Sequence, residues 1–262
     1  MNAVNASPII ELDRVCKTFG NNPAVVDLSF RVMPGEIVAL LGKTGAGKST
    51  ALHMIMGALE PSSGTVRING VDPFHQFQKL RGKLAVSFQT DRLMPWRSAV
   101  DNVALGLQIL GCDRSTRTRR AVEWLHNVKI EGEENIRKYP HELSGGMRQR
   151  VSLARALAID PDLVLLDESF SQLDHVTSKE LRSDFRDLVR RLNKTCVLIT
   201  HRIDDALEMA DRVLVLAAPA RVALEIEVPE DKRHDEEWLQ AQQDAIAAAM
   251  GDAGIPAEPP HS

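Results

Sequence analysis

The chain has 262 residues with 32 Lys and Arg against 36 Asp and Glu, and its net charge of −4 gives no bulk attraction to nucleic acid. This length can bury a substantial core, so we expect one catalytic domain with a small lobe. No apolar run approaches the roughly 18 residues of a membrane-spanning helix, and the three cysteines lack metal-ligand spacing, so we expect neither a membrane span nor a cysteine-based metal site.

The N-terminal part of the chain carries the pattern of β-strands. Residues 9–30 are expected to form strands around a turn at 20–23. Turn signals at 61–64 and 69–70 precede a further strand at 84–88. We therefore expect hairpin-like connections in this region.

A glycine-rich turn joins an apolar run of strand type, 37–41, to a helix predicted over 51–59. Such a turn points successive backbone N–H groups inward, and the helix N-terminus adds its positive dipole end, so the arrangement favours a polyphosphate. Lys48 can reach the β- and γ-phosphates, and the Ser49 hydroxyl is placed to ligate Mg²⁺. The predicted nucleotide-binding residues are Gly42, Lys43, Thr44, Gly45, Ala46, Gly47, Lys48, Ser49 and Thr50.

The strand predicted at 163–166 ends in two carboxylates, Asp167 and Glu168. Ligands of open α/β sheets lie outside the carboxyl ends of the strands, so both side chains are expected near the nucleotide. Asp167 would hold Mg²⁺, directly or through water, and Glu168 would act as general base on the attacking water. A solvated strand end and a chance match of the glycine-rich turn are the alternatives. The two features together favour an ATP-hydrolysing site.

The middle and the end of the chain differ in pattern. Between about 90 and 158 the periodicity is helical, and 98–101 has the form of a capping box. The chain from 229 onward is acidic, with a possible short helix at 235–250 and a Pro-rich end that we expect to fray. We expect a catalytic domain over 1–228 and an acidic C-terminal tail over 229–262.

The stretch that begins at Leu143, Leu-Ser-Gly-Gly-Met-Arg-Gln, resembles the Leu-Ser-Gly-Gly-Gln signature of the ATP-binding-cassette family. The resemblance extends from about residue 9 to residue 228, with its elements in the family's order and spacing. It implies an α/β fold with a P-loop NTPase core, an antiparallel β subdomain and an inserted helical subdomain at about 90–158. It also implies that the cofactors are ATP and Mg²⁺.

The resemblance assigns the signature residues to a neighbouring subunit. In the family, the residues corresponding to Ser144, Gly145 and Gly146 cover the γ-phosphate bound to a second subunit, which implies a homodimer. Considered alone, Ser144 would be an ordinary cap of a helix over 148–158.

Four further positions resemble family residues. Gln89 corresponds to the glutamine that contacts Mg²⁺ and the attacking water, and His201 to the switch histidine that contacts the γ-phosphate. Asp174 corresponds to the aspartate at the dimer seam, and Phe19 to the aromatic residue that stacks on adenine. Taken singly, each residue has a structural alternative: Gln89 could be a loop amide and His201 a helix cap. Asp174 could be an N-cap and Phe19 a core aromatic. Their shared order and spacing with the other motifs favour the functional roles.

The loop after Gln89 resembles a segment of importer subunits for nitrate, sulfonate and taurine-like solutes. It has the sequence Leu-Met-Pro-Trp from Leu93 to Trp96, followed by an Asn-Val pair at 102–103. In such importers a helix of the membrane subunit docks beside this loop, and an apolar surface at Trp96 suits a partner interface. Packing of Trp96 within the helical lobe is the alternative.

The resemblance therefore implies an ATPase subunit of a bacterial importer of a small solute. Its partners would be a second ATPase subunit, transmembrane permease subunits and, indirectly, a periplasmic or lipid-anchored solute-binding protein, with no nucleic acid. It would lie peripherally on the cytoplasmic side of the cell membrane. An exporter subunit is one alternative, and a non-transport cassette ATPase acting on DNA or the ribosome is another. The second is disfavoured because the chain carries one cassette, with no long insertion between Ser49 and Ser144.

Overall fold

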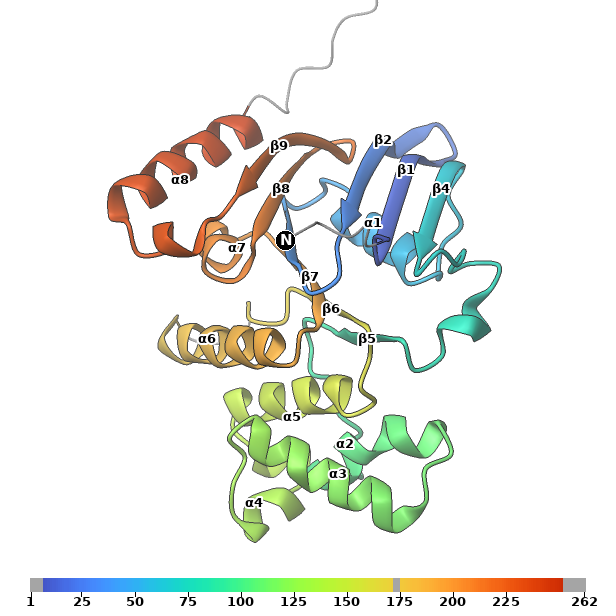
Figure 1. Ribbon diagram of the computed structural model, residues 1–262, viewed down its shortest axis with the longest axis vertical. Coiled ribbons are helices and arrows are strands. Elements are labelled where there is room, and N and C mark those ends of the chain that lie inside the picture. Colours follow the sequence, from blue (N-terminus) through green and yellow to red (C-terminus); the bar gives the residue numbers. More distant parts are fainter. Residues whose placement is uncertain (1–6, 172–174, 252–262) are drawn as a thin grey trace, which may run out of the picture.

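The computed structural model describes residues 7–171 and 175–251, and its strands form two sheets (Figure 1). The smaller sheet is antiparallel in the order β2-β1-β4. Its strands are β1 Ile10–Phe19, β2 Asn22–Val32 and β4 Ser63–Ile68. The turn predicted between the first two strands is present, and the sheet is the antiparallel subdomain that the family resemblance implied.

The larger sheet has six strands in the order β5-β6-β7-β3-β8-β9. Its pairs are parallel except that β9 runs antiparallel to β8. Every residue of β3 and β7 is buried, which explains why both read as continuous apolar runs. The strands are β3 Ile37–Leu41, β5 Leu84–Ser87, β6 Leu163–Asp167, β7 Thr195–Thr200, β8 Arg212–Ala217 and β9 Arg221–Glu227.

The large sheet separates two apolar cores. Ile37 and Leu41 of β3 face the core that includes the helical lobe, whereas Val38 and Leu40 face the core shared with the small sheet. This alternation follows from the period of two along a strand. Among the residues that the structure describes, no helix is both long enough and apolar enough to cross a membrane.

A helical lobe is inserted between β5 and β6 and lies in the lower part of Figure 1. Ser98 caps its first helix: the hydroxyl accepts a hydrogen bond from the backbone N–H of Asp101 at 3.3 Å and donates to the Asp101 carboxylate at 2.8 Å. The N-cap half of the predicted capping box is therefore present, but the Asp101 carboxylate accepts from the Ser98 hydroxyl rather than from the Ser98 backbone N–H. The helices of the lobe are α2 Ala99–Ile109, α3 Arg114–Asn127, α4 Glu133–Arg137, 3₁₀ helix η2 Pro140–Glu142 and α5 Gly145–Leu157.

The helix after β3 was predicted over the wrong range. α1 spans Lys48–Ile55 rather than 51–59, so it begins earlier and ends a turn sooner. Gly57 ends it with a φ of +71°, and a Cβ atom at this position would lie 2.1 Å from the carbonyl oxygen of Pro73. The left-handed conformation of Gly57 ends the helix, and the close approach of the 73–74 backbone requires glycine at this position. That segment leads to the 3₁₀ helix η1 Phe77–Leu80.

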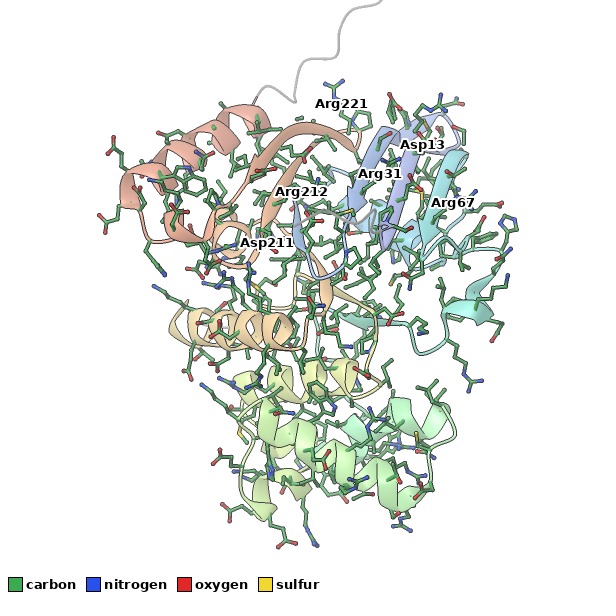
Figure 2. All side chains as sticks on the ribbon, viewed as in Figure 1. Asp13, Arg31, Arg67, Asp211, Arg212 and Arg221 are labelled. Carbon is green, nitrogen blue, oxygen red and sulfur yellow. The ribbon has the colours of Figure 1, made fainter. Side chains whose placement is uncertain are left out.

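Arg212 of β8 connects the two sheets. Its Nε donates to Glu36 Oε1 at 2.7 Å, and its Nη1 donates to Glu225 Oε1 at 2.7 Å. It also donates to the backbone carbonyl of Arg31 in β2. Figure 2 shows Arg212 and Arg31 close together at the border between the sheets. The hydrogen bonds and the two ion pairs of Arg212 hold the small sheet against the large sheet.

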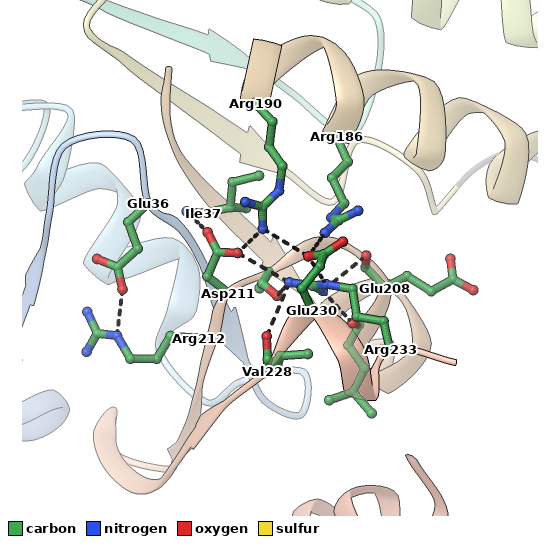
Figure 3. Close-up of polar contacts among 12 residues, drawn as sticks. Glu36, Ile37, Arg186, Arg190, Glu208, Asp211, Arg212, Val228, Glu230 and Arg233 are labelled. Atoms are coloured by element: carbon green, nitrogen blue, oxygen red, sulfur yellow. Dashed lines mark hydrogen bonds and ion pairs between the residues drawn. The ribbon is translucent and has the colours of Figure 1, made fainter. Parts of the chain in front are cut away.

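The C-terminal segment is anchored by a buried arginine (Figure 3). Arg233 follows the 3₁₀ helix η3 Glu230–Lys232 and donates to the backbone carbonyls of Leu207 at 3.0 Å and Ala210 at 2.7 Å, at the end of α7 Ile203–Met209. Its guanidinium also contacts Glu230 at 2.9 Å and Asp211 at 3.2 Å. Arg233 therefore satisfies carbonyls that a helix C-terminus leaves without intrahelical partners.

The last helix packs on the large sheet. α8 Glu236–Gly251 occupies the stretch where the sequence indicated a short helix, and it contacts β8 and β9. Its Ile246 is fully buried in the core that faces the helical lobe. The remaining long helix, α6 His175–Arg191, lies between the sheet and the lobe (Figure 1). Four residues of α6 form an apolar stripe that is buried in the same core: Leu181, Phe185, Leu188 and Val189.

Candidate functional site

The glycine-rich turn between β3 and α1 forms a concave backbone segment. Gly45 and Gly47 both adopt left-handed φ angles, of +84° and +85°. A Cβ atom at Gly47 would lie 2.4 Å from the carbonyl oxygen of Ala24, so only glycine fits there. Gly47 caps α1 without a side-chain hydrogen bond, and the first turn of the helix has no acidic residue. The start of α1 is therefore a helix N-terminus without a side-chain cap, the kind of site that can bind an anion.

Lys48 is the cation of this turn. Its ammonium donates to the backbone carbonyls of Gly42 at 2.7 Å and Lys43 at 2.9 Å. Burial lowers the pKa of Lys48, while the negative charges of Glu168 and Asp167 raise it. The lysine thus lies within the field of both carboxylates at the end of β6.

Asp167 and Glu168 occupy the carboxyl end of β6, as predicted. Burial is the main cause that raises the pKa of Asp167, and the adjacent charge of Glu168 raises it further. His53, Arg92 and Lys48 oppose this effect. A cation near a partly buried carboxylate that lies beside a second carboxylate stabilises its charged form, and carboxylate and hydroxyl oxygens such as those of Asp167 and Ser49 are donor types that Mg²⁺ prefers.

Glu168 contacts the two other residues predicted to be catalytic. Its Oε1 lies 3.2 Å from Nδ1 of His201, and its Oε2 accepts a hydrogen bond from Nε2 of Gln89 at 3.3 Å. Glu168 adopts a φ of +48°, and its N–H donates to the carbonyl of Ile199 in β7 at 2.9 Å. The structure therefore brings Gln89, Glu168 and His201 together, although each follows a different strand: β5, β6 and β7 respectively.

Two serines that motif analysis did not assign support this cluster. Ser169 Oγ donates to the carbonyl of Ser87 at 2.9 Å, and Ser171 Oγ donates to the carbonyl of Glu168 at 2.8 Å. Gln89 Nε2 also approaches Ser171 Oγ at 3.5 Å. These bonds fix the loop after β6 against the end of β5. The sequence shows that both serines follow Glu168 closely, but it does not show which carbonyl groups accept their hydrogen bonds.

The signature residues lie in another part of the chain. Ser144 caps α5 by accepting a hydrogen bond from the backbone N–H of Met147 at 3.2 Å, and Ser144 and Gly145 are exposed. Within 7–171 and 175–251, no hydrogen bond or ion pair joins 144–146 to the turn at 42–50. The signature residues therefore do not form one site with the glycine-rich turn of the same chain.

Two further residues were predicted to belong to the site, Phe19 and Asp174. Phe19 lies at the end of β1 and is 50% exposed, with Lys17 Nζ 5.5 Å from its ring centroid. It is therefore not a core aromatic and its ring is accessible to a planar ligand. Asp174 lies outside the described residues.

Sequence comparison connects this geometry to known proteins. A family model described as ABC transporter matches residues 25–171. The taurine import ATP-binding protein TauB of Pseudomonas aeruginosa is 42% identical over 209 residues, which are 79% of this chain and 77% of that protein. The Fe(3+) ions import ATP-binding protein FbpC of Agrobacterium fabrum is 37% identical over 246 residues, 94% of this chain and 67% of that protein.

A glycine betaine transport ATP-binding protein, OpuAA of Bacillus subtilis, is 38% identical over 208 residues. The match covers 77% of this chain and 49% of the relative, so the chain spans about half the length of that protein. Among solved structures, the dimeric bacterial ABC transporter cassette MJ0796 has a TM-score of 0.74 and 31% identity, covering 84% of this chain and 99% of that one. The cassette cbiO1 of Clostridium perfringens, at 24% identity and a TM-score of 0.79, shares the fold.

Proposed function

Since this chain belongs to the ABC transporter family, as one of its ATP-hydrolysing subunits, we propose that it powers the uptake of a small solute through a separate membrane permease. The names of its relatives support the import direction, because they include import proteins for taurine and Fe(3+) ions. These solutes differ in chemistry, so the solute class rests on the segment around Trp96 and on the 42% identity to the taurine protein. We propose a sulfonate-like or nitrate-like anion.

One observation carries the chemical part of the proposal. Glu168 Oε1 lies 3.2 Å from His201 Nδ1, and the negative charges of Glu168 and Asp167 act on Lys48 in the turn before α1. One edge of the sheet, where ligands of α/β folds bind, therefore carries the three parts that we propose: Glu168 as base, His201 as the residue that orients it, and the turn at 42–50 as a phosphate cradle.

Each side chain then has a role in hydrolysis. The N–H groups of 42–50 and the Lys48 ammonium would hold the phosphates of ATP, while Phe19 would stack on the adenine. Ser49, Asp167 and Gln89 would hold Mg²⁺, which when bound neutralises charge on the phosphate oxygens. Glu168 would accept the proton of the water that attacks the γ-phosphorus, and His201 would orient the Glu168 carboxylate and contact the γ-phosphate.

We propose that the working unit is a homodimer. Within the part of the chain that the structure describes, the signature residues 144–146 form no hydrogen bond or ion pair with the turn at 42–50. They form the N-terminus of α5, where Ser144 and Gly145 are exposed. That N-terminus would cover the γ-phosphate on the second subunit. Dimeric structures of the cassette MJ0796, one bound to ADP and phosphate, support this arrangement. Asp174 would lie at the same seam.

The permease would bind beside the loop at 93–97. Trp96 is 71% exposed, so the alternative that it packs within the helical lobe is wrong. Ile109 and Leu110, at the end of α2, add exposed apolar surface to the same lobe. Large exposed apolar side chains favour a partner interface. Docking to a permease there would place the chain peripherally on the cytoplasmic side of the membrane.

Reconstitution tests the proposal. The chain and a permease shown to bind it would be placed in proteoliposomes, with labelled taurine and the cognate solute-binding protein on one side and ATP on the other. We expect ATP-dependent solute accumulation on the side opposite the binding protein. A complex carrying Glu168→Gln is the control. ATP-driven movement toward the side of the binding protein would contradict an importer, and uptake of iron or betaine instead of taurine would contradict the solute class.

A further inference from the structure

Arg182 of α6 is a fully buried charge that the proposed hydrolysis does not use. Its side chain is 1% exposed. Its Nη1 lies 2.8 Å from Asp205 Oδ1 and 2.6 Å from Ser178 Oγ, and its Nε donates to Glu208 Oε2 at 2.7 Å. Asp205 and Glu208 belong to α7, so this guanidinium joins α6 to the helix that follows His201.

One branch of the Arg182 contacts leads to the loop that carries Glu168. Ser178 Oγ, which accepts from Arg182, donates to the backbone carbonyl of Phe170 at 3.2 Å. Phe170 comes two residues after Glu168 in the chain, is 1% exposed and packs its ring against Phe185 at a centroid distance of 6.1 Å. The start of α6 and the Glu168 loop are thus held by a buried hydrogen bond and by an aromatic contact.

The other branch leads to His201. The second carboxylate oxygen of Asp205 accepts from the hydroxyl of Thr200 at 3.4 Å, and the same hydroxyl accepts from the backbone N–H of Arg202 at 3.0 Å. These bonds lie on both sides of His201 in the chain. Burial raises the pKa of Asp205, and the charge of Arg182 is the largest influence that opposes this. Arg182 therefore helps to keep Asp205 charged and able to accept the hydrogen bond from the Thr200 hydroxyl.

We propose that Arg182 is a positioning residue for ATP hydrolysis, which holds the Glu168 loop and the His201 loop at the 3.2 Å separation of their side chains. The proposal rests on the roles assigned above to Glu168 and His201. A role in stabilising the fold alone explains the buried Arg182 side chain less well. A buried ion pair recovers little more than its desolvation penalty, and an apolar residue would extend the buried apolar stripe of α6.

A matched pair of variants separates positioning from stability. Arg182→Met removes the link to α7, whereas Arg186→Met, one turn farther along α6, removes an ion pair to Glu230 and leaves the two catalytic loops untouched. In the full-length chain assembled with its permease, we expect Arg182→Met to lower kcat by up to about 10²-fold with nearly unchanged nucleotide affinity. Arg186→Met should keep kcat. An equal loss of kcat in both variants, or unchanged kcat in Arg182→Met, would overturn the proposal.

A double variant tests the route of the effect. If part of the effect of Arg182 passes through His201, adding Arg182→Met to His201→Ala should lower the single-turnover hydrolysis rate by a smaller factor than Arg182→Met does alone, because only the branch to the Glu168 loop remains to be lost. Losses that multiply in full would overturn the proposal. If Arg182→Met does not fold, Asp205→Asn preserves the side-chain shape and should show the same fall in kcat without a change in nucleotide affinity, and full kcat there would count against it.

A Glu168→Gln arm tests the premise separately. Full activity in Glu168→Gln would remove the assigned general base, and with it the premise of the proposal. An inactive Glu168→Gln together with a fully active Arg182→Met would reject only the positioning role.

Discussion

Glu168 and His201 meet at the carboxyl ends of β6 and β7, with 3.2 Å between Glu168 Oε1 and His201 Nδ1. The backbone hydrogen bond from the N–H of Glu168 to the carbonyl of Ile199 aligns the two strand ends. Gln89 approaches the other carboxylate oxygen from β5. The carboxylate is therefore held from two sides, which suits a base that must point at one water molecule.

Glu168→Gln should abolish proton acceptance while keeping the shape of the side chain. We expect turnover to fall roughly 10²- to 10⁴-fold, because general base catalysis contributes an effect of that size. Binding of MgATP should persist, and an equilibrium binding assay on the same preparation provides the control. Near-normal ATPase activity in the complex with the permease would remove Glu168 from the role of general base.

Phe19→Ala should weaken ATP binding by about 1 kcal/mol or slightly more, because a base stacked on an aromatic ring contributes on that scale. The ring is 50% exposed, so its removal should leave the melting temperature nearly unchanged. Calorimetric titration with ATP and a thermal melt measure the two quantities. An unchanged affinity with a lowered melting temperature would identify Phe19 as a structural residue.

A mixed dimer tests whether Ser144 serves the nucleotide of the neighbouring subunit. Pairing a Lys48→Ala subunit with a Ser144→Arg subunit places both changes in one composite site and leaves the other site intact. A dimer with both changes in each subunit has no intact site. We expect trapped nucleotide at one site per mixed dimer and at none in the doubly changed dimer, counted after purification of tagged species.

Equal loss of trapped nucleotide in the two dimers would argue against sites shared across the seam. A mixed dimer of Lys48→Ala with the unchanged chain is the control. It should also retain one intact site, so it reports how well the dimer tolerates asymmetry.

Glu230→Gln should change how stability depends on pH. Hydrogen bonds from Arg186 and then Arg233 lower the pKa of Glu230 from 4.5 to about 2. Because the folded-state pKa is lowered, the stabilisation by Glu230 is fully present above pH 4.5 and is lost as the pH falls toward about 2. The Glu230 side chain is 66% exposed, so the effect at neutral pH should not exceed about 1 kcal/mol.

Urea unfolding at several pH values measures this effect. The difference in unfolding free energy between wild type and Glu230→Gln should shrink as the pH falls from 4.5 to about 2. Glu227→Gln is the matched control, since no ion pair joins Glu227 within the described residues, and it should show little difference at any pH. A constant difference for Glu230→Gln across this range would show that its ion pairs do not stabilise the fold.

Local sequence determined most of the elements and the residue types of the site. The apolar run of β3, the Ser98 cap of α2 and the glycine pattern around Lys48 each depend on neighbours within a few residues, so a single sequence reveals them. Glu168 was identifiable by the strand that it follows, whereas Gln89 and His201 were assigned by the family resemblance. The sequence placed Glu168 at the carboxyl edge of the sheet, but its contacts with Gln89 and His201 came only from the structure.

Tertiary structure decided the features that depend on partners far away in the chain. The backbone at Pro73 approaches Gly57 so closely that only glycine fits there, a contact that the helical periodicity of 51–59 cannot reveal. Arg182 reads as one more charge on α6, and only folding places it between Asp205 and Ser178. Arg233 likewise acquires its carbonyl partners from α7. Periodicity and capping follow from short-range geometry, whereas a buried charge is stabilised by whichever groups the complete fold brings to it.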